Sequence, residues 1–275
     1  MKEYQLLVEI IFKMVNGEEM HLIISQNIAI SGASGKMGKA IIIASSERND
    51  FIISAGSVSS HNKLLGLDLG ELCGIRNLGK SLSSSLDTLF QDADVIIDFS
   101  SIENSLKVLE HASKKSIPVL IGTTGFNDKQ FNQIKKFAEK IPVLYAPNTS
   151  MGISMLKNMI YSSYSFFSHF QLVSLEETHH IEKKDSPSGT AKYLAKNINL
   201  GLKENIKDSD IKSNRSGDIK GEHEIIFKNN NEEIKILHTV KDRSVFAEGA
   251  IDGAKWLSRQ ESGAYDMSDV YLFSS

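Results

Sequence analysis

The stretch NIAISGASGKMGKAIIIASSE, residues 27–47, decides the fold of this chain. It begins as a short apolar run, turns through Gly32, Gly35 and Gly38, and continues as a segment of helical length. Glycines between a buried strand and a helix allow a tight turn, close backbone approach to a pyrophosphate, and close packing of helix on strand. The N–H groups and dipole at the start of the helix favour phosphate groups. The stretch therefore predicts a dinucleotide site, although Ser34 replaces one glycine of the usual fingerprint and a purely structural turn is the alternative.

The chain continues as alternating strand-like and helix-like segments. Apolar runs rich in Val and Ile recur at 51–58, 94–100, 117–125 and 141–148. Between the last three, apolar residues recur at helical spacing over 102–115 and 128–140. Continuous apolar strands that alternate with helices are typical of a parallel sheet covered on both faces.

The pattern changes after Asn148. We expect a long helix over 151–168, a strand over 170–178, a helix over 190–203, and an antiparallel hairpin from GEHEIIF (221–227) and EEIKILHTV (232–240). The segment FAEGAIDGAKWL (246–257) predicts a helix that returns to the first domain. The predicted fold class is α/β: a Rossmann-like parallel-sheet domain over 27–149, completed by 244–275, and a second α+β domain with a mainly antiparallel open sheet over 150–243. Residues 1–26 are interpreted as an N-terminal extension.

Bulk composition narrows the function. The net charge of −3 gives no reason to expect nucleic acid as a partner. Cys73 is the single cysteine, so no intramolecular disulfide can form, which fits a reducing cytoplasm. No apolar run approaches the roughly 18 residues of a membrane span. We therefore expect a cytoplasmic protein with no membrane partner.

Small and hydroxyl-bearing residues follow three strand ends, in DFSS (98–101), GTTG (122–125) and APNTS (146–150). Each alone is ordinary turn chemistry, but ligands of open parallel sheets bind outside the carboxyl ends of the strands. Together they predict a cofactor crevice. The segment AGSVSSHNK (55–63) holds no acid for a ribose hydroxyl, and its polar residues, with Lys36, favour the 2′-phosphate of NADPH over NADH. A plain solvated loop is the alternative for Ser57, Ser59, His61 and Lys63.

Polar and basic chemistry concentrates in EETHHIEKKDSPSGTAKYLA, residues 176–195. His179 and His180 are adjacent on a predicted strand, and Ser188, Gly189 and Thr190 begin a helix whose N-terminus suits an anion. With Lys183 between them, these groups predict a site for a substrate with carboxylates, at which a His or Lys supplies a proton. A solvated loop before an amphipathic helix is the alternative. We predict no metal site, because the two adjacent histidines cannot easily share one ion.

In these motifs, and in IGTTGF, GDIKGEHEIIF and SGAYDMSDV, the chain resembles the dihydrodipicolinate reductase family over residues 27 to 270. The family reduces a cyclic imine-type dicarboxylate with NADPH or NADH in lysine and diaminopimelate biosynthesis, and many members are homotetramers. The resemblance therefore implies that the second domain binds the small-molecule dicarboxylate substrate and mediates oligomerisation.

The resemblance also implies residue roles. His179 resembles the proton donor and Lys183 a second catalytic position. The implied substrate contacts are His180, Ser188, Gly189 and Thr190. The implied cofactor contacts are Gly32, Ala33, Ser34, Gly35, Lys36, Met37, Phe99, Ser100, Gly122, Thr123, Thr124, Ala146, Pro147, Asn148, Thr149 and Arg243.

The chain departs from the family pattern in three places. Ile181 and Glu182 stand where the family has Arg and His, which removes positive charge beside Lys183. Between residues 207 and 213 the chain is interpreted as shorter than the family, with a glycine- and arginine-rich segment missing and one strand of the second sheet in question, and residues 1–26 have no counterpart. Two other functions therefore remain open: a dehydrogenase of another amino or imino acid, and a nucleotide-binding paralogue without turnover.

Overall fold

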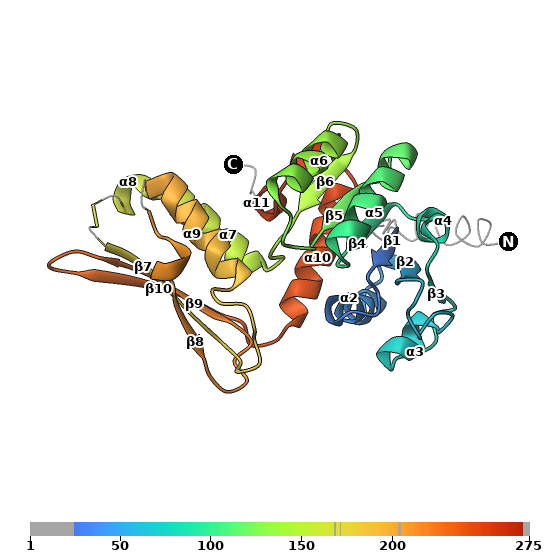
Figure 1. Ribbon diagram of the computed structural model, residues 1–275, viewed down its shortest axis with the longest axis horizontal. Helices are drawn as coiled ribbons and strands as arrows, with labels where there is room; N and C mark the ends of the chain where they lie inside the picture. The colour runs from blue at the N-terminus through green and yellow to red at the C-terminus, as the bar shows by residue number, and fades with distance from the viewer. Residues whose placement is uncertain (1–24, 168, 171, 203–204, 272–275) are drawn as a thin grey trace, which may run out of the picture.

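The computed structural model describes residues 25–167, 169–170, 172–202 and 205–271. These residues form two sheets that lie apart, each with its own helices, and the helix α10 (Ser244–Leu257) lies between them (Figure 1). Residues 1–24 of the predicted extension lie outside the described residues. Within the described part of the chain, no helix has the length and apolar character needed to cross a bilayer.

The larger sheet is parallel throughout, as the strand–helix alternation predicts. Its strand order is β11-β6-β5-β4-β1-β2-β3, and every neighbouring pair runs parallel. The strands are β1 (Gln26–Ser31), β2 (Phe51–Ser57), β3 (Leu82–Ser83), β4 (Val95–Asp98), β5 (Val119–Ile121), β6 (Pro142–Tyr145) and β11 (Gly263–Tyr265). The order reverses between β1 and β4, and in open sheets of this kind ligands bind where it reverses.

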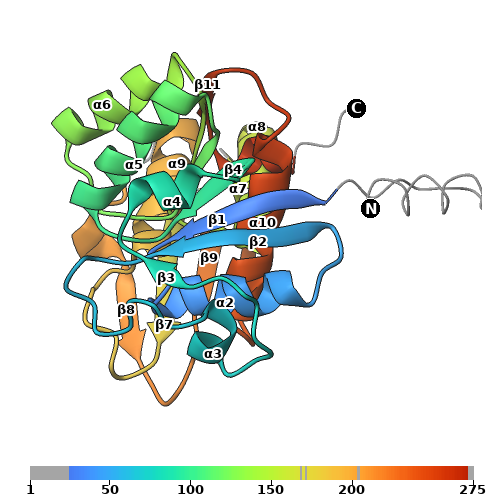
Figure 2. The same cartoon turned by 90° about the vertical axis from the view of Figure 1, so that its right-hand side faces the viewer.

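Helices cover both faces of this sheet, as Figure 2 shows. They are α2 (Lys36–Ser46), α3 (Leu69–Cys73), α4 (Leu86–Phe90), α5 (Ile102–Lys115), α6 (Asp128–Ala138), α10 and α11 (Met267–Val270). In β1, Ile28 and Ile30 join the core formed with α2 and α10, whereas Ala29 joins the core formed with α4 and α5. All three are fully buried, so the strand reads as one apolar run.

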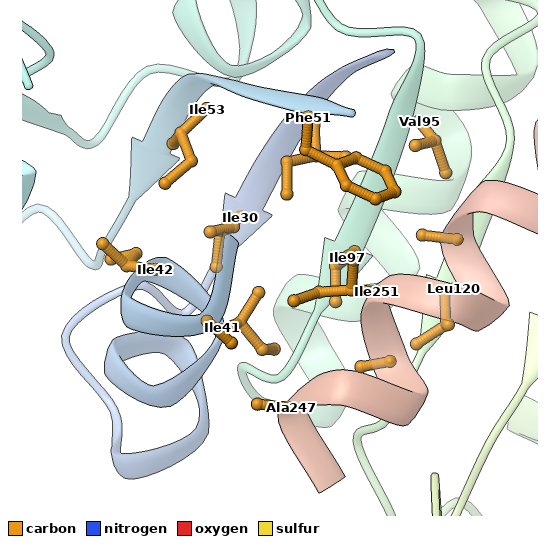
Figure 3. Packing of buried hydrophobic residues seen from close by; sticks show 14 of the residues in the cluster. Ile30, Ile41, Ile42, Phe51, Ile53, Val95, Ile97, Leu120, Ala247 and Ile251 are labelled. Atoms are coloured by element: carbon orange, nitrogen blue, oxygen red, sulfur yellow. The ribbon is translucent and has the colours of Figure 1, made fainter. Parts of the chain in front are cut away.

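The first core is built mainly from aliphatic side chains of the sheet, α2 and α10, with Phe51 among them (Figure 3). Ile41 of α2 and Ile251 of α10 are fully buried, and burying a side chain of this size stabilises a fold by about 1.5–3 kcal/mol. The predicted return of the 246–257 helix to the first domain is thus confirmed. Because α10 is buried against the parallel sheet, it determines where the chain returns to the first domain.

The smaller sheet has the order β10-β9-β7-β8 and helices on one face. Its elements are α7 (Met151–Ser162), α8 (Tyr164–Phe167), β7 (Leu172–His179), α9 (Gly189–Leu202), the 3-10 turn Asp208–Asp210, β8 (Lys212–Arg215), β9 (Glu222–Lys228) and β10 (Glu233–Thr239). The predicted hairpin of β9 and β10 is confirmed, and β7 pairs antiparallel with β9, while β8 runs parallel to β7. The predicted fold class is therefore confirmed, with one parallel pair in the second sheet.

The helix expected over 151–168 differs in detail. It is two helices, because α7 ends at Ser162 and Ser163 leaves the helical conformation, with its N–H donating back to Met159 and Ile160. The buried residues of the pair, including Ile153, Leu156 and Phe167, pack with α9 against β7 and β9.

Candidate active site

A cleft of about 400 Å³ lies between the carboxyl edge of the parallel sheet and the smaller sheet. The first domain and the chain crossing contribute Met37, Phe99, Gly122, Thr124, Ala146, Pro147, Asn148 and Thr149. The second contributes His179, His180, Lys183, Asp185, Ser188, Gly189, Thr190 and Lys220, and the segment entering α10 contributes Arg243 and Phe246. Most residues with implied roles therefore meet in one cleft, although the sequence places them up to two hundred residues apart.

The remaining implied residues lie beside the cleft, in the loops that follow β1, β4 and β5 and at the start of α2. They are Gly32, Ala33, Ser34, Gly35, Lys36, Ser100 and Thr123. Among them, Ser100 and Thr123 are joined by a 3.1 Å hydrogen bond from the Ser100 N–H to Thr123 Oγ1.

The glycine loop is shaped by close backbone approaches. Gly32 has φ +81°, and a Cβ there would lie 2.3 Å from the Phe99 carbonyl oxygen. A Cβ on Gly38 would lie 2.4 Å from the Gly32 carbonyl oxygen, so α2 packs directly against the turn. Gly35, the N-cap of α2, is exposed and caps the helix with no side-chain hydrogen bond. The N-terminal N–H groups of α2 therefore face the loop without a competing side chain, which suits a pyrophosphate.

The end of β2 lies beside this loop. Asn62 Nδ2 donates to Ser34 Oγ at 3.0 Å, a contact that the sequence pattern did not single out. Ser59, His61 and Lys63 are exposed, as is Lys36, whereas Ser57 is buried. Ser57 contributes its carbonyl oxygen, which accepts from the N–H groups of Gly32 and Ala33.

A buried carboxyl group joins the strand ends. Asp98, at the end of β4, is fully buried and accepts hydrogen bonds from Ser100 Oγ at 2.6 Å, from Thr123 Oγ1 at 3.1 Å and from Ser105 Oγ. Burial raises the pKa of the Asp98 carboxyl, and the hydroxyl hydrogen bonds only partly offset it. Asp98 thus holds the DFSS and GTTG loops in one arrangement beside the cleft.

His179 is the last residue of β7 and is 7% exposed. Its Nδ1 lies 3.1 Å from Oε2 of Glu177, whose side chain is completely buried. Because side chains alternate along a strand, residues 177 and 179 share the face of β7 that is turned toward the helices. Burial opposes ionisation of Glu177, but the His179 imidazole beside it and the polar groups of Ser188 and Ser213 outweigh burial and hold the pKa of this carboxyl below its ordinary value.

His223 of β9 completes a buried cluster that the sequence did not predict. Its ring lies 5.2 Å from the His179 ring in an edge-on arrangement, and its Nε2 lies 3.3 Å from Ser188 Oγ and 3.9 Å from Glu177 Oε2. Burial, with the neighbouring His179, lowers the pKa of His223 to about 3, so this ring is neutral at neutral pH. The sequence signal was present in the alternation of GEHEIIF, which puts His223 on the buried face with Ile225 and Phe227.

Lys183 lies on the turn after β7. Its Nζ contacts Asp185 Oδ1 at 2.7 Å, and burial of Asp185 is outweighed by this contact, which lowers the pKa of the Asp185 carboxyl. Ile181 and Glu182 are exposed and do not line the cleft, so the residues that replace the family's Arg and His point elsewhere. Asp185, not Glu182, is the acid beside Lys183.

Arg215 connects this turn to the buried carboxylate. Its guanidinium lies 3.3 Å from Glu177 Oε1 and donates to the carbonyl oxygens of Lys183 and Asp185. Arg215 reaches these groups because β8 pairs parallel to β7, with Arg215 opposite His179. The arrangement ties the position of Lys183 to that of Glu177.

The N-terminus of α9 forms another wall of the cleft. Ser188 is buried, accepts from the Ala191 N–H at 3.1 Å and donates its own N–H to Glu177 at 3.0 Å. Gly189 and Thr190 open the helix, and Asn148 Nδ2 donates to Thr190 Oγ1 at 2.7 Å. This helix end, with Lys183, Lys220, His180 and Arg243 around it, favours a ligand that carries carboxylates.

Among the described residues, Glu177, His179 and His223 form a group spaced as metal ligands could be, with one ligand atom from each lying within 4.8 Å of the others. Glu177 also pairs with Arg215, which already balances the carboxylate charge. His180 is next to His179 in the sequence, but the histidine that lies beside the His179 ring in space is His223.

Known proteins are similar in sequence to nearly the whole chain. Two family models match, "Dihydrodipicolinate reductase, N-terminus" over residues 26–149 and "Dihydrodipicolinate reductase, C-terminus" over residues 152–271. The 4-hydroxy-tetrahydrodipicolinate reductase of Hahella chejuensis is 36% identical over 260 residues, 88% of this chain and 97% of the relative. That of Magnetococcus marinus is 33% identical over 263 residues, 90% and 98% of the two chains.

A solved structure shares the fold. The dipicolinate-bound dihydrodipicolinate reductase from Paenisporosarcina sp. TG-14 aligns with a TM-score of 0.73 at 22% identity, covering 89% of this chain and 99% of that one.

Proposed function

The chain belongs to the dihydrodipicolinate reductase family, and from this premise we propose that it reduces 4-hydroxy-tetrahydrodipicolinate to tetrahydrodipicolinate in the cleft between its two sheets. One observation carries the assignment to this cleft: His179, Lys183 and the N-terminus of α9 face the loops that follow β4, β5 and β6 across one space. A reductase needs its proton donor, its carboxylate-binding groups and its nucleotide loops within one such space.

The loops fit a nicotinamide nucleotide. Gly32 makes its turn in the left-handed region, and the uncapped N-terminus of α2 suits the pyrophosphate. The proposed contacts are those implied by the resemblance: residues 32–37, Phe99, Ser100, residues 122–124, residues 146–149 and Arg243. When bound, the nucleotide supplies the hydride.

The substrate side is proposed to use the basic groups of the second sheet. Lys183, His180 and the N–H groups at the start of α9 bind the two carboxylates, with Ser188, Gly189 and Thr190 shaping that helix end. Lys183 would exchange Asp185 for a substrate carboxylate, because Asp185 is exposed enough to return to water. These contacts orient the ring toward the nucleotide face of the cleft.

The proton is proposed to come from His179, with Lys183 as the second catalytic group. Reduction of the conjugated imine leaves electron density on the ring that a proton must quench. His179 lines the cleft at the end of the strand β7, so the sheet fixes the position of the proton donor during the reaction.

Four finer assignments belong to the same proposal. NADPH is the preferred nucleotide, since residues 58–63 after β2 offer Asn62, His61 and Lys63 and no acid. The chain works in the cytoplasm as a homotetramer whose contacts come from the second domain, residues 150–243. We propose domain boundaries at 149–150 and 243–244, and the position of these residues in the two segments that connect the sheets supports them.

The test is a coupled assay in which the preceding synthase generates substrate from pyruvate and aspartate semialdehyde, with NADPH or NADH consumption followed by absorbance. We expect substrate-dependent oxidation, faster with NADPH. His179→Gln should lower kcat by about 100-fold, since general acid catalysis contributes about 10²–10⁴-fold, with NADPH affinity unchanged by titration. Nucleotide binding without any turnover by the wild type would contradict the proposed function, and an unchanged kcat in the variant would contradict the role of His179.

A further inference from the structure

We propose that Glu177 is a positioning residue for His179: its buried carboxylate holds the imidazole through Nδ1, so that Nε2 is the nitrogen offered to the substrate. The inference deepens the proposed function, on which it rests, by assigning the group that orients the proton donor. Glu177 does not line the cleft, so it acts through His179 and not on the substrate.

The carboxylate is itself held on its other oxygen. Oε1 accepts from the Ser188 N–H at 3.0 Å and lies 3.3 Å from Arg215 Nη2, while Oε2 lies 3.1 Å from His179 Nδ1. Each of these partners sits on a different element, the start of α9, β8 and the end of β7. The position of Oε2 is therefore set by the fold, and His179 must adapt to it.

The charge of Glu177 selects one tautomer of the ring. An ionised carboxylate accepts hydrogen bonds and cannot donate them, so it favours the tautomer that carries hydrogen on Nδ1. The N–H donors around Glu177 keep the pKa of its carboxyl low despite full burial, so this preference holds at neutral pH. A ring that has delivered its proton from Nε2 is then left as the Nδ1–H form, with an Nε2 lone pair that can be protonated again.

The opposite edge of the ring is kept clear. A Cβ on Gly221 would lie 3.1 Å from His179 Nε2 and 3.5 Å from Cδ2. The buried ring of His223 stands edge-on at 5.2 Å and blocks a rotation toward β9. The His179 ring therefore has the Glu177 carboxylate at Nδ1, the His223 ring at its side and Gly221 beside Nε2. These neighbours fix the proton donor in one orientation.

The experiment compares Glu177→Gln with Glu176→Gln. Both remove one negative charge from neighbouring positions of β7, but Glu176 points to the other face and pairs with Lys212. Glutamine at 177 keeps the length of the side chain and can still accept from Ser188 and Arg215, but its amide can also donate to Nδ1. We expect Glu177→Gln to lower kcat by about tenfold or more, as carboxylate partners of functional histidines do, with the affinity for NADPH within about twofold of wild type. Glu177→Asp should restore part of kcat, and Glu176→Gln should match wild type.

A spectroscopic readout makes the inference independent of turnover. In ¹⁵N-histidine-labelled enzyme, with His179→Gln used to assign its signals, we expect the neutral His179 ring to be the Nδ1–H form in wild type and a tautomer mixture in Glu177→Gln. An Nε2–H ring in wild type, an unchanged kcat in Glu177→Gln, or loss of activity on removal of metal with EDTA would each overturn the inference. A wild type without turnover would overturn the proposed function instead, while the tautomer measurement would still decide the role of Glu177. If Glu177→Gln fails to fold, the wild-type tautomer decides alone.

Discussion

Asn62 is the side chain best placed to influence the choice between NADPH and NADH. It reaches Ser34 of the glycine loop at 3.0 Å, and it stands after β2, where a carboxylate would bind a ribose 2′-hydroxyl. Its own oxygen accepts from the Leu64 N–H at 2.9 Å, so its orientation is fixed by the turn. The group that a 2′-phosphate would meet here is therefore a neutral, preorganised amide with His61 and Lys63 as neighbours.

We expect Asn62→Asp to shift the preference toward NADH. The new carboxylate keeps the Leu64 contact, repels a 2′-phosphate and can accept from a free 2′-hydroxyl. The ratio of kcat/KM for NADPH to that for NADH should fall by about tenfold, which corresponds to about 1.4 kcal/mol. Asn77→Asp is the matched control, because Asn77 makes the same turn contact, to the Gly79 N–H at 2.8 Å, away from the loop. An unchanged ratio in Asn62→Asp would contradict the placement of the 2′ position.

The buried partners of His179 show where residue-level prediction from the sequence stops. The motif at residues 176–195 indicated His179 and Lys183 as candidate site residues, because a cluster of polar and basic residues before a helix is visible in the sequence alone. Glu177 is next to them but reads as one more acid on a strand, and His223 lies 44 positions from His179. Their roles depend on the register of β7 against β9 and on the burial of one face, which only the assembled sheet defines.

At the scale of elements, α10 is attached to the parallel sheet by charge as well as by apolar packing. Asp50, just before β2, accepts from Arg48 Nε at 2.9 Å and Nη2 at 3.0 Å and from Lys255 of α10 at 2.6 Å. Arg48 also donates to Asp252 of α10 at 2.9 Å. The Arg48 hydrogen bonds, helped by Lys255 and opposed by burial, hold the pKa of the Asp50 carboxyl well below its ordinary value.

We expect Asp50→Asn to lower the free energy of unfolding at pH 7 by about 2 kcal/mol, the scale of hydrogen bonds to charged groups. Because the pKa of Asp50 is lower in the folded state, its contribution is present above the ordinary value of 3.8 and is lost as the pH falls toward the folded value. The difference between wild type and variant should therefore shrink between pH 5 and pH 2 in denaturant titrations. Asp92→Asn, at an exposed loop position, should leave stability nearly unchanged. A difference between wild type and Asp50→Asn that stayed constant with pH would contradict the ion-pair explanation.

Helices and strands with a strong apolar periodicity could be predicted from the sequence. Elements that form only because they pair with or pack on another element could not. The continuous apolar runs of β1, β4, β5 and β6 predicted a doubly covered parallel sheet, since only burial on both faces tolerates such runs. The β8 strand, KSNR, has no apolar alternation and exists because β7 offers it a parallel edge. The break between α7 and α8 was equally hidden, because the apolar residues continue through Ser163 while the helix does not.

At the scale of the whole molecule, the chain passes between the two sheets twice, and a hydrogen bond joins these two connecting segments. Thr149, between β6 and α7, donates from Oγ1 to the Phe246 carbonyl oxygen of α10 at 2.6 Å. The close approach is possible because Gly249 has no side chain: a Cβ there would lie 1.7 Å from the Thr149 carbonyl oxygen. The crossings therefore form one joint, and we predict that any motion of the second sheet toward the first turns about residues near Ser150 and Arg243.

One contact beyond the joint reports the position of the second sheet: Asn148 Nδ2 donates to Thr190 Oγ1 at 2.7 Å, across the cleft. It links the loop after β6 to the N-terminus of α9, so it holds the helix end that we propose to bind carboxylates beside the loops that we propose to bind the nucleotide. Thr190→Val keeps the shape and β-branching of the side chain but removes the acceptor. We expect the KM for substrate to rise by about three- to tenfold, the value of a hydrogen bond of about 1 kcal/mol, while NADPH binds as before. Thr178→Val, on the opposite face of β7, should change neither quantity. If Thr190→Val weakened NADPH binding and left the KM for substrate unchanged, the N-terminus of α9 would contact the nucleotide. That result would contradict the proposal that the second sheet and its helices bind the substrate while the parallel sheet binds the nucleotide.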